Sequence, residues 1–179
     1  FTAVEIDRFA KDEKLSVEEV LNQLKVVGLN SLTGGGAEIF SLRMREIFCH
    51  DKISPQIWIN IHQAAHKLGL SSNATMLYGL GEYDEEIIDH LIALREAQDE
   101  TCLPMPTGRQ AAGKAGGFSC FIPLAYQPEK GKDEFGPSPL ENLRIIALAR
   151  LILDNFQHIK AYWPMIGVDT AAVGLSWGA

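Results

Sequence analysis

The sequence predicts an α/β fold in which helices cover a parallel sheet. Strand-like and helix-like segments alternate about five times along the chain. Three helical segments open with a serine cap, and the strand at 118–125 is almost continuously apolar, as in strands buried on both faces. Right-handed β–α–β connections would make the strands parallel. About five units are too few to close an eight-stranded barrel, so we expect an open arc, a partial TIM-type (β/α) barrel.

The helical segments have recognisable ends. The first opens at Ser16, which can form a capping box with Glu19, and it closes at Gly28. The second opens at Ser54, with Pro55 in its first turn. Further helices are expected from Asp84, Ser138 and Asp169, and strands at 1–6, 29–32, 70–77, 118–125 and 159–165.

Two segments between these elements show neither the helical nor the strand period. Residues 101–117 are rich in Gly, Pro and Ala, and residues 127–137 are polar. We interpret both as surface loops, the first of them longer than most connections in α/β proteins. Because the loops that follow parallel strands carry the functional sites, the second is expected to lie closer to the site.

Composition excludes several classes of protein. The net charge is -7 and there is no run of Lys and Arg, so neither nucleic acid nor a membrane surface is expected as a partner. No apolar run approaches the roughly 18 residues of a membrane span, and no secretory signal is visible. Cys49, Cys102 and Cys120 are too widely spaced for a metal knuckle or a disulfide framework, so we expect reduced thiols in a cytoplasmic chain without a metal site of its own.

The most distinctive segment is a turn of three glycines, Gly34, Gly35 and Gly36, followed by the carboxylate of Glu38. Glycine tolerates positive φ and lets the backbone approach a ligand closely. A turn of this kind after a parallel strand suits a binding loop at the carboxyl edge of the sheet. Tight packing of the glycines beside a solvated Glu38 is the alternative, and the turn alone does not decide between the two.

Two histidines, His62 and His66, stand in the sequence H-Q-A-A-H. The spacing imitates a zinc-protease helix, but Gln63 replaces the Glu that such an enzyme needs. We therefore expect both histidines to be structural.

Five segments, taken in order, resemble the aminofutalosine synthase family. These enzymes are radical S-adenosylmethionine enzymes of the futalosine route to menaquinone. The resemblance covers nearly the whole chain, and SNATMLYG with FIPLA favours this family over dehypoxanthine futalosine cyclase or a deazaflavin (FO) synthase subunit, which share the glycine turn. The segments are FTAVEI (1–6), GGGAEIF (34–40), SNATMLYG (72–79), FIPLA (121–125) and LDN with IKAYW (153–155 and 159–163).

The resemblance implies a transferase. A [4Fe-4S] cluster and an external reductant would cleave S-adenosylmethionine, and the adenosyl radical would add to 3-[(1-carboxyvinyl)oxy]benzoate. Rearrangement and loss of carbon dioxide or bicarbonate would then give aminofutalosine. The family holds its cluster with C-x-x-x-C-x-x-C, which this chain lacks. We therefore expect residues 1–179 to be the central and C-terminal part of the barrel, with the cluster ligands upstream of Phe1, and we expect this part alone to be inactive. A non-catalytic chain that acts only through association is a further alternative.

The resemblance also implies roles for residues at strand ends. Glu38 would accept hydrogen bonds from the ammonium or ribose of S-adenosylmethionine, and the glycine amides would meet its carboxylate. Asn73 and Thr75 share one strand face. Tyr78 could stack on an aromatic ring, with core packing as the alternative, and Glu5 could instead be ion-paired or solvated. The expected cofactor-binding set is Gly34, Gly35, Gly36, Glu38, Asn73, Thr75, Tyr78 and Glu5, with Tyr126 and Gln127 contacting substrate.

The chain departs from the family pattern in three places, and the catalytic residue stays unassigned. Thr33 stands where proline is expected, Gln127 stands where histidine is expected, and residues 101–117 look like an insertion. The two carboxylates of the substrate require a cation. Four helical arginines are candidates, although solvated or ion-paired positions are their default: Arg43, Arg45, Arg144 and Arg150.

Overall fold

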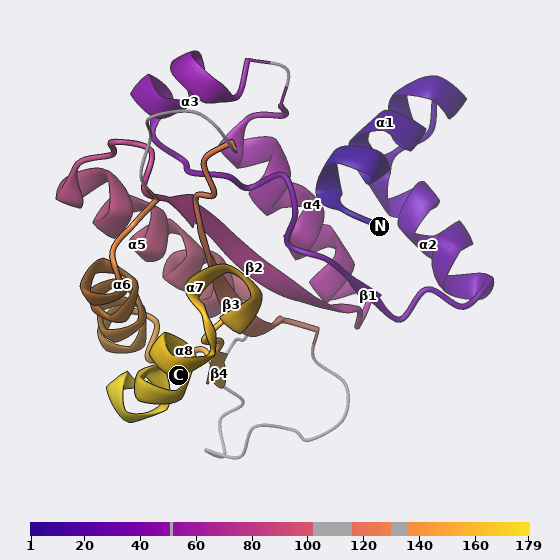
Figure 1. Ribbon diagram of the computed structural model, residues 1–179. Helices are drawn as coiled ribbons and strands as arrows, with labels where there is room; N and C mark the ends of the chain where they lie inside the picture. Colours follow the sequence, from indigo (N-terminus) through magenta and orange to yellow (C-terminus); the bar gives the residue numbers. More distant parts are fainter. Residues whose placement is uncertain (51, 102–115, 130–135) are drawn as a thin grey trace.

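A computed structural model describes residues 1–50, 52–101, 116–129 and 136–179 (Figure 1). Most of the expected loop at 101–117 and part of the one at 127–137 therefore lie outside the described residues. Four strands form one parallel sheet in the order β1 (Ser31–Leu32), β2 (Ser71–Tyr78), β3 (Phe118–Ala125) and β4 (His158–Ile159). Each strand pairs with the next one in sequence, which right-handed crossover connections produce. The α/β class is confirmed, while membership of a TIM-type barrel stays a prediction.

The helices begin where the sequence places their caps. Ser16 and Ser138 form capping boxes with Glu19 and Glu141, and the Ser54 side chain accepts from the amide of Ile57. The helices are α1 (Ala3–Glu13), α2 (Val17–Val26), α3 (Leu42–Phe48), α4 (Pro55–Lys67), α5 (Asp84–Thr101), α6 (Pro139–Ile152), α7 (Trp163–Ile166) and α8 (Val168–Gly174), followed by a 3₁₀ turn, η1 (Leu175–Trp177). Helix α3, which follows the glycine turn and carries Arg43 and Arg45, was expected only as a helix-like stretch without stated bounds.

The strand expected at 1–6 is wrong except at its beginning. Thr2 forms an isolated parallel bridge with Thr33, and helix α1 starts at the next residue. The Thr2 hydroxyl accepts from the amide of Glu5, and the Glu5 carboxylate accepts from the amide of Thr2 at 2.7 Å. This capping box fixes a helix start in a segment whose aromatic and β-branched residues favour a strand. The described residues therefore form four strands rather than five.

The last expected strand, 159–165, is also mostly wrong. Only His158 and Ile159 pair with β3, and the amide of Lys160 makes a final bond to the Phe121 carbonyl at 2.9 Å. Pro164 stands at the start of α7. Proline has no amide hydrogen for a sheet and suits the first turn of a helix, so the chain leaves the sheet here.

The two faces of the sheet differ in what covers them, because side chains alternate along each strand. The face we call the covered face packs against helices: the Ser72 hydroxyl meets His62 of α4, and the Tyr78 hydroxyl donates to Asn142 Oδ1 of α6 at 2.7 Å. In Figure 1, α4 and α5 run behind the strands. The face we call the open face carries Asn73, Thr75, Leu77, Cys120, Ile122 and Leu124. Four of these six side chains stay half-buried, whereas those of the covered face in β2 are at most 2% exposed.

Candidate functional site

The glycine turn leaves the carboxyl end of β1 and packs tightly on β2. The Gly34 carbonyl accepts from Thr75 Oγ1 at 2.6 Å, and the Gly35 carbonyl accepts from Trp58 Nε1 at 3.3 Å. A Cβ atom on Gly34 would lie 2.6 Å from the Asn73 carbonyl oxygen, and Gly36 has a φ of +88°. Both positions therefore need glycine for close packing or for backbone conformation. The sequence left two explanations for the glycines, tight packing and ligand binding. The structure shows the tight packing.

The same contacts orient the amides of the turn. In a trans peptide the N–H points opposite to the preceding carbonyl. Because the carbonyls of Gly34 and Gly35 face the protein, the amides of Gly35 and Gly36 point away from Thr75 and Trp58. Within the part of the chain that the structure describes, neither amide has an acceptor. Consecutive free amides are suited to a carboxylate or another oxyanion.

Glu38 lies beside this turn with an unusual backbone. Its φ is +49°, a left-handed conformation that non-glycine residues rarely adopt. The amide of Leu77 donates to the Glu38 carbonyl at 2.8 Å. Its carboxylate lies 3.4 Å from Lys52 Nζ, and its side chain is 23% exposed. The Glu38 carboxylate is thus partly accessible to solvent, and a hydrogen bond from β2 fixes the backbone of this residue.

Arg45 of α3 holds the same segment from the other side. Its Nη1 donates to the carbonyls of Ala37 at 2.9 Å and Ile39 at 3.3 Å, and its Nη2 donates to the carbonyl of Ile53. The residue is 8% exposed, so the guanidinium acts inside the protein rather than in solvent. Carbonyls on both sides of Glu38 are therefore fixed by one side chain. Nothing in the sequence marks Arg45 for this role.

The other three arginines proposed as substrate cations are also engaged. Arg43 pairs with Glu86 at 2.6 Å, and the hydrogen bonds it donates lower the pKa of that carboxyl to about 2. Arg144 pairs with Asp84 at 2.5 Å, and Arg150 donates to the Gly178 carbonyl at 2.7 Å.

Asn73 and Thr75 share the open face, as the alternation predicted. Thr75 is buried and its hydroxyl is used by the Gly34 carbonyl. Asn73 is half-buried, and its Oδ1 accepts from the Ser119 hydroxyl at 3.1 Å. Thr75 therefore supports the turn, whereas Asn73 offers a polar group beside it.

Two members of the expected cofactor set lie elsewhere. Tyr78 is buried on the covered face, where its hydroxyl bonds Asn142, and burial raises its pKa. Its ring is enclosed and has no face free for stacking. Glu5 is not at a strand end, because its carboxylate caps α1 through Thr2 and the cap lowers its pKa. The strand-end position expected for Glu5 is therefore corrected, whereas Tyr78 does end β2 and packs in the core.

The two expected substrate contacts follow β3. The amide of Tyr126 donates to the Tyr78 carbonyl at 2.8 Å, which extends the pairing of β2 and β3. The side-chain amide of Gln127 donates to the Met165 carbonyl at 3.1 Å and ties the end of β3 to α7. Both residues lie at the carboxyl edge of the sheet, and their contact with substrate stays a prediction.

A cluster of buried histidines supports the site from the covered face. The Ser72 hydroxyl lies 2.8 Å from His62 Nδ1 and 2.7 Å from His66 Nε2. His90 accepts from the Phe40 amide at 3.2 Å, and its Nε2 lies 3.0 Å from the Thr75 carbonyl. Burial lowers the pKa of His62 and His90 to about 3 and that of His66 to about 4. The structural role expected for His62 and His66 is confirmed, and His90 joins them.

No group of three or more His, Cys, Asp or Glu side chains within the described residues is arranged to hold a metal ion. Among the same residues, no helix is both long and apolar enough to cross a membrane.

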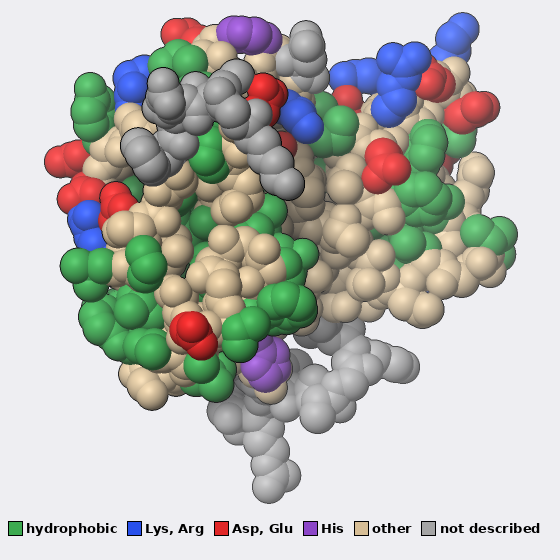
Figure 2. Space-filling view, viewed as in Figure 1, with side chains coloured by type: hydrophobic (Ala, Val, Ile, Leu, Met, Phe, Trp, Pro, Cys, Tyr) green, Lys and Arg blue, Asp and Glu red, His purple; other side chains and the backbone are tan. Residues whose placement is uncertain are grey.

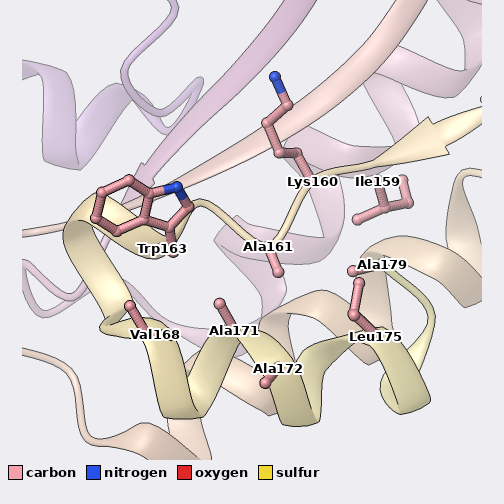
Figure 3. Close-up of a pocket in the computed structure, with 9 residues that line it drawn as sticks. All are labelled: Ile159, Lys160, Ala161, Trp163, Val168, Ala171, Ala172, Leu175 and Ala179. Carbon is pink, nitrogen blue, oxygen red and sulfur yellow. The ribbon is translucent and has the colours of Figure 1, made fainter.

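An apolar cavity of about 420 Å³ lies between the end of β4 and α8 (Figure 3). Hydrophobic side chains also gather on the surface over α8 at the lower left of Figure 2.

The chain matches no protein-family model. It is similar over nearly its whole length to a group of curated enzymes. Aminodeoxyfutalosine synthase of Thermus thermophilus is 46% identical over 99% of this chain. The 5-amino-6-(D-ribitylamino)uracil–L-tyrosine 4-hydroxyphenyl transferase 2 of Methanosarcina mazei is 40% identical over 98% of it. Cyclic dehypoxanthine futalosine synthase of Streptomyces coelicolor is 38% identical over 99% of it.

These relatives are much longer than the chain, which spans 46%, 44% and 41% of their respective lengths. The resemblance to aminofutalosine synthases that the five segments suggest is therefore confirmed as similarity over residues 1–179. The cyclase alternative belongs to the same group of similar enzymes.

Proposed function

We propose that this chain is part of a radical S-adenosylmethionine enzyme and that its glycine turn binds S-adenosylmethionine. The observation that carries the proposal is that one turn holds the amides of Gly35 and Gly36, which have no acceptor among the described residues, and the partly exposed carboxylate of Glu38. The amides suit the carboxylate of the cofactor's methionine part, and Glu38 suits its ammonium or a ribose hydroxyl. When bound, the cofactor supplies the adenosyl group for radical chemistry. The residues of this chain bind and orient it.

The described cysteines do not fit an iron–sulfur cluster. Cys49 and Cys120 are both buried, burial raises the pKa of each thiol, and no C-x-x-x-C-x-x-C motif exists in the chain. We therefore propose that another part of a longer cytoplasmic protein holds the cluster and that residues 1–179 alone are inactive. A reductant would supply the electron.

The proposed reaction is that of an aminofutalosine synthase, which transfers the adenosyl group to 3-[(1-carboxyvinyl)oxy]benzoate. The similarity to aminodeoxyfutalosine synthase supports it. Dehypoxanthine futalosine cyclase and an FO synthase subunit stay alternatives of the same superfamily. Their reactions start from other substrates, so product analysis separates them.

The test is direct. The coding sequence adjoining this chain is expected to contain C-x-x-x-C-x-x-C. The full-length protein, with its cluster reconstituted and reduced, is expected to form aminofutalosine from the two substrates, detected by mass spectrometry. A missing motif would contradict the radical mechanism, and turnover of a futalosine or a deazaflavin precursor instead would select an alternative. A full-length protein without any of these activities would leave association as the function.

A further inference from the structure

Lys160 occupies the open face of the sheet, next to the end of β4. The pairing of Phe121 with Ile159 places Lys160 beside Ile122, which in turn pairs with Thr75. Ile159 is buried, so alternation turns the next side chain toward the opposite face. The positive charge of Lys160 lowers the pKa of Cys120 against the effect of burial, which raises it, in agreement with a position on that face.

This row connects Lys160 to the glycine turn. Thr75 and Ile122 pair on β2 and β3, Lys160 directly follows the end of β4 on the far side of Ile122, and the Thr75 hydroxyl donates to the Gly34 carbonyl. Two strand spacings separate the backbones of Thr75 and Lys160, or about 10 Å. A lysine side chain covers part of that span. An anion bound by Lys160 would thus lie within the length of a small aromatic molecule from the turn.

The ammonium group of Lys160 is available. The side chain is exposed, and its Nζ has no acceptor within hydrogen-bond or ion-pair distance among the described residues. Lys52 by contrast pairs with Glu38. Two more lysines have no acceptor among the described residues, but Lys14 ends α1 and Lys67 ends α4, away from the open face.

The surroundings favour an anion that carries an apolar body. Lys160 lines the apolar cavity of Figure 3 together with Ala161 and Trp163, and the strand register places it next to half-buried Ile122. Figure 3 shows the Lys160 side chain pointing away from the apolar residues of α8 that line the same cavity. An ammonium beside apolar groups attracts a carboxylate more strongly than one surrounded by water.

We propose that Lys160 binds a carboxylate of an aryl carboxylate substrate and so positions the substrate across the open face from the glycine turn. The proposal rests on the proposed function and assigns the cation that none of the four arginines supplies. Ile122 would contact the apolar body of the substrate. Lys160 takes no part in proton or electron transfer in this role.

The experiment uses the full-length enzyme with its cluster reconstituted. In Lys160→Gln, we expect the KM for 3-[(1-carboxyvinyl)oxy]benzoate to rise at least tenfold while kcat changes less. Lys160→Arg should recover most of the affinity because it restores the positive charge. Lys67→Gln, a lysine of the same kind away from the face, is the matched control and should behave as wild type. Circular dichroism of each variant checks its fold.

Substrate analogues make the test specific. One analogue carries an amide in place of the benzoate carboxylate, and a second carries an amide in place of the vinyl carboxylate. Calorimetry with the oxidised enzyme measures their binding without turnover. Wild type should discriminate at least tenfold against one of them, and Lys160→Gln should lose that discrimination.

The outcomes separate the two proposals. Wild type that neither binds nor converts the benzoate contradicts the proposed function. Wild type that binds and converts it, with unchanged discrimination in Lys160→Gln, overturns the role of Lys160. If Lys160→Gln does not fold, the Lys160→Arg variant decides on its own. If Lys160→Arg binds the benzoate substrate only as weakly as wild type binds the neutral amide analogue, the positive charge has no role.

Discussion

The two faces of β2 and β3 share one backbone and differ in what they do. On the covered face, Ser72 and Tyr78 find partners in α4 and α6, and neither side chain is more than 2% exposed. On the open face, Asn73 and Ile122 stay half-buried. Covered positions stabilise the protein through packing and buried hydrogen bonds, whereas open positions leave chemical groups available. The glycine turn combines both kinds of role, because its carbonyls accept from the buried side chains of Thr75 and Trp58 while its amides point away from them.

Lowering the pH should destabilise the protein through the buried histidines on the covered face, and this is the largest expected effect on the free energy of unfolding. His62, His66 and His90 have folded pKa values of about 3, 4 and 3, whereas unfolded histidine titrates near pH 6.5. Below pH 6.5 the unfolded state therefore binds more protons, and stability falls as the pH drops toward 4. Three such groups give a slope of up to about 4 kcal/mol per pH unit.

Denaturant titrations from pH 7 to pH 4.5 measure this slope. His158→Gln is the control, because that histidine is exposed on β4. It should leave the slope unchanged. A free energy of unfolding that stays constant down to pH 4.5 would contradict neutral buried histidines.

Gly34→Ala should cost the next largest amount. Its Cβ would lie 2.6 Å from the Asn73 carbonyl oxygen, and the backbone of β2 cannot give way as a flexible side chain can. We expect a loss of about 2–3 kcal/mol in the free energy of unfolding. Gly35→Ala is the matched control, because its Cβ would meet only the Thr2 side chain at 3.1 Å. Chemical denaturation measures both variants. Equal losses of unfolding free energy would mean that the close contact between Gly34 and β2 does not limit the side chain at this position.

Arg45→Lys separates the support of Glu38 from its chemistry. Lysine cannot bridge the carbonyls of Ala37 and Ile39, so the Glu38 backbone loses one of its two restraints. We expect a loss of about 1–2 kcal/mol in stability and weaker binding of S-adenosylmethionine to the full-length protein. Arg8→Lys, in the exposed pair with Asp12, should affect neither by much. Unchanged cofactor affinity in Arg45→Lys would show that Glu38 needs no such support.

A pair of neighbouring substitutions on β2 compares the two faces directly, and its open-face member should give the smallest effect. Ser72→Ala removes the hydroxyl between two buried imidazoles and should cost about 1–3 kcal/mol. Asn73→Ala, one residue further along, should stay within about 0.5 kcal/mol because its side chain is half-exposed. Equal costs, measured by urea denaturation, would mean that the two faces are not distinct.

Local signals predicted the elements that depend on local interactions. The serine caps at 16, 54 and 138 placed three helices, and the apolar run at 118–125 placed β3. The error at the beginning of the chain was of the same local kind, because Thr2 and Glu5 carry a capping-box spacing that outweighed strand propensity. Pro164 similarly marked the end of the last strand.

The site was predictable only in part. Alternation along β2 placed Asn73 and Thr75 on one face, and the same rule puts Tyr78 with Ser72 on the other. The support of Glu38 by Arg45 depends on how α3 folds back onto the turn. His90, which bonds the Thr75 carbonyl, lies 15 residues further along the chain in α5. Such contacts arise from the tertiary fold and leave no pattern in the sequence.

One measurement tests the central claim most directly: the dissociation constant of S-adenosylmethionine for the full-length protein and its Glu38→Gln variant, by calorimetry with the cluster oxidised. Glutamine keeps the size of the side chain and removes the charge that attracts an ammonium or a ribose hydroxyl. We predict that the variant binds at least tenfold more weakly, while Glu82→Gln, a carboxylate that bonds the amide of Gly79, binds as wild type. Equal dissociation constants for wild type and Glu38→Gln would contradict the assignment of the glycine turn as the cofactor site.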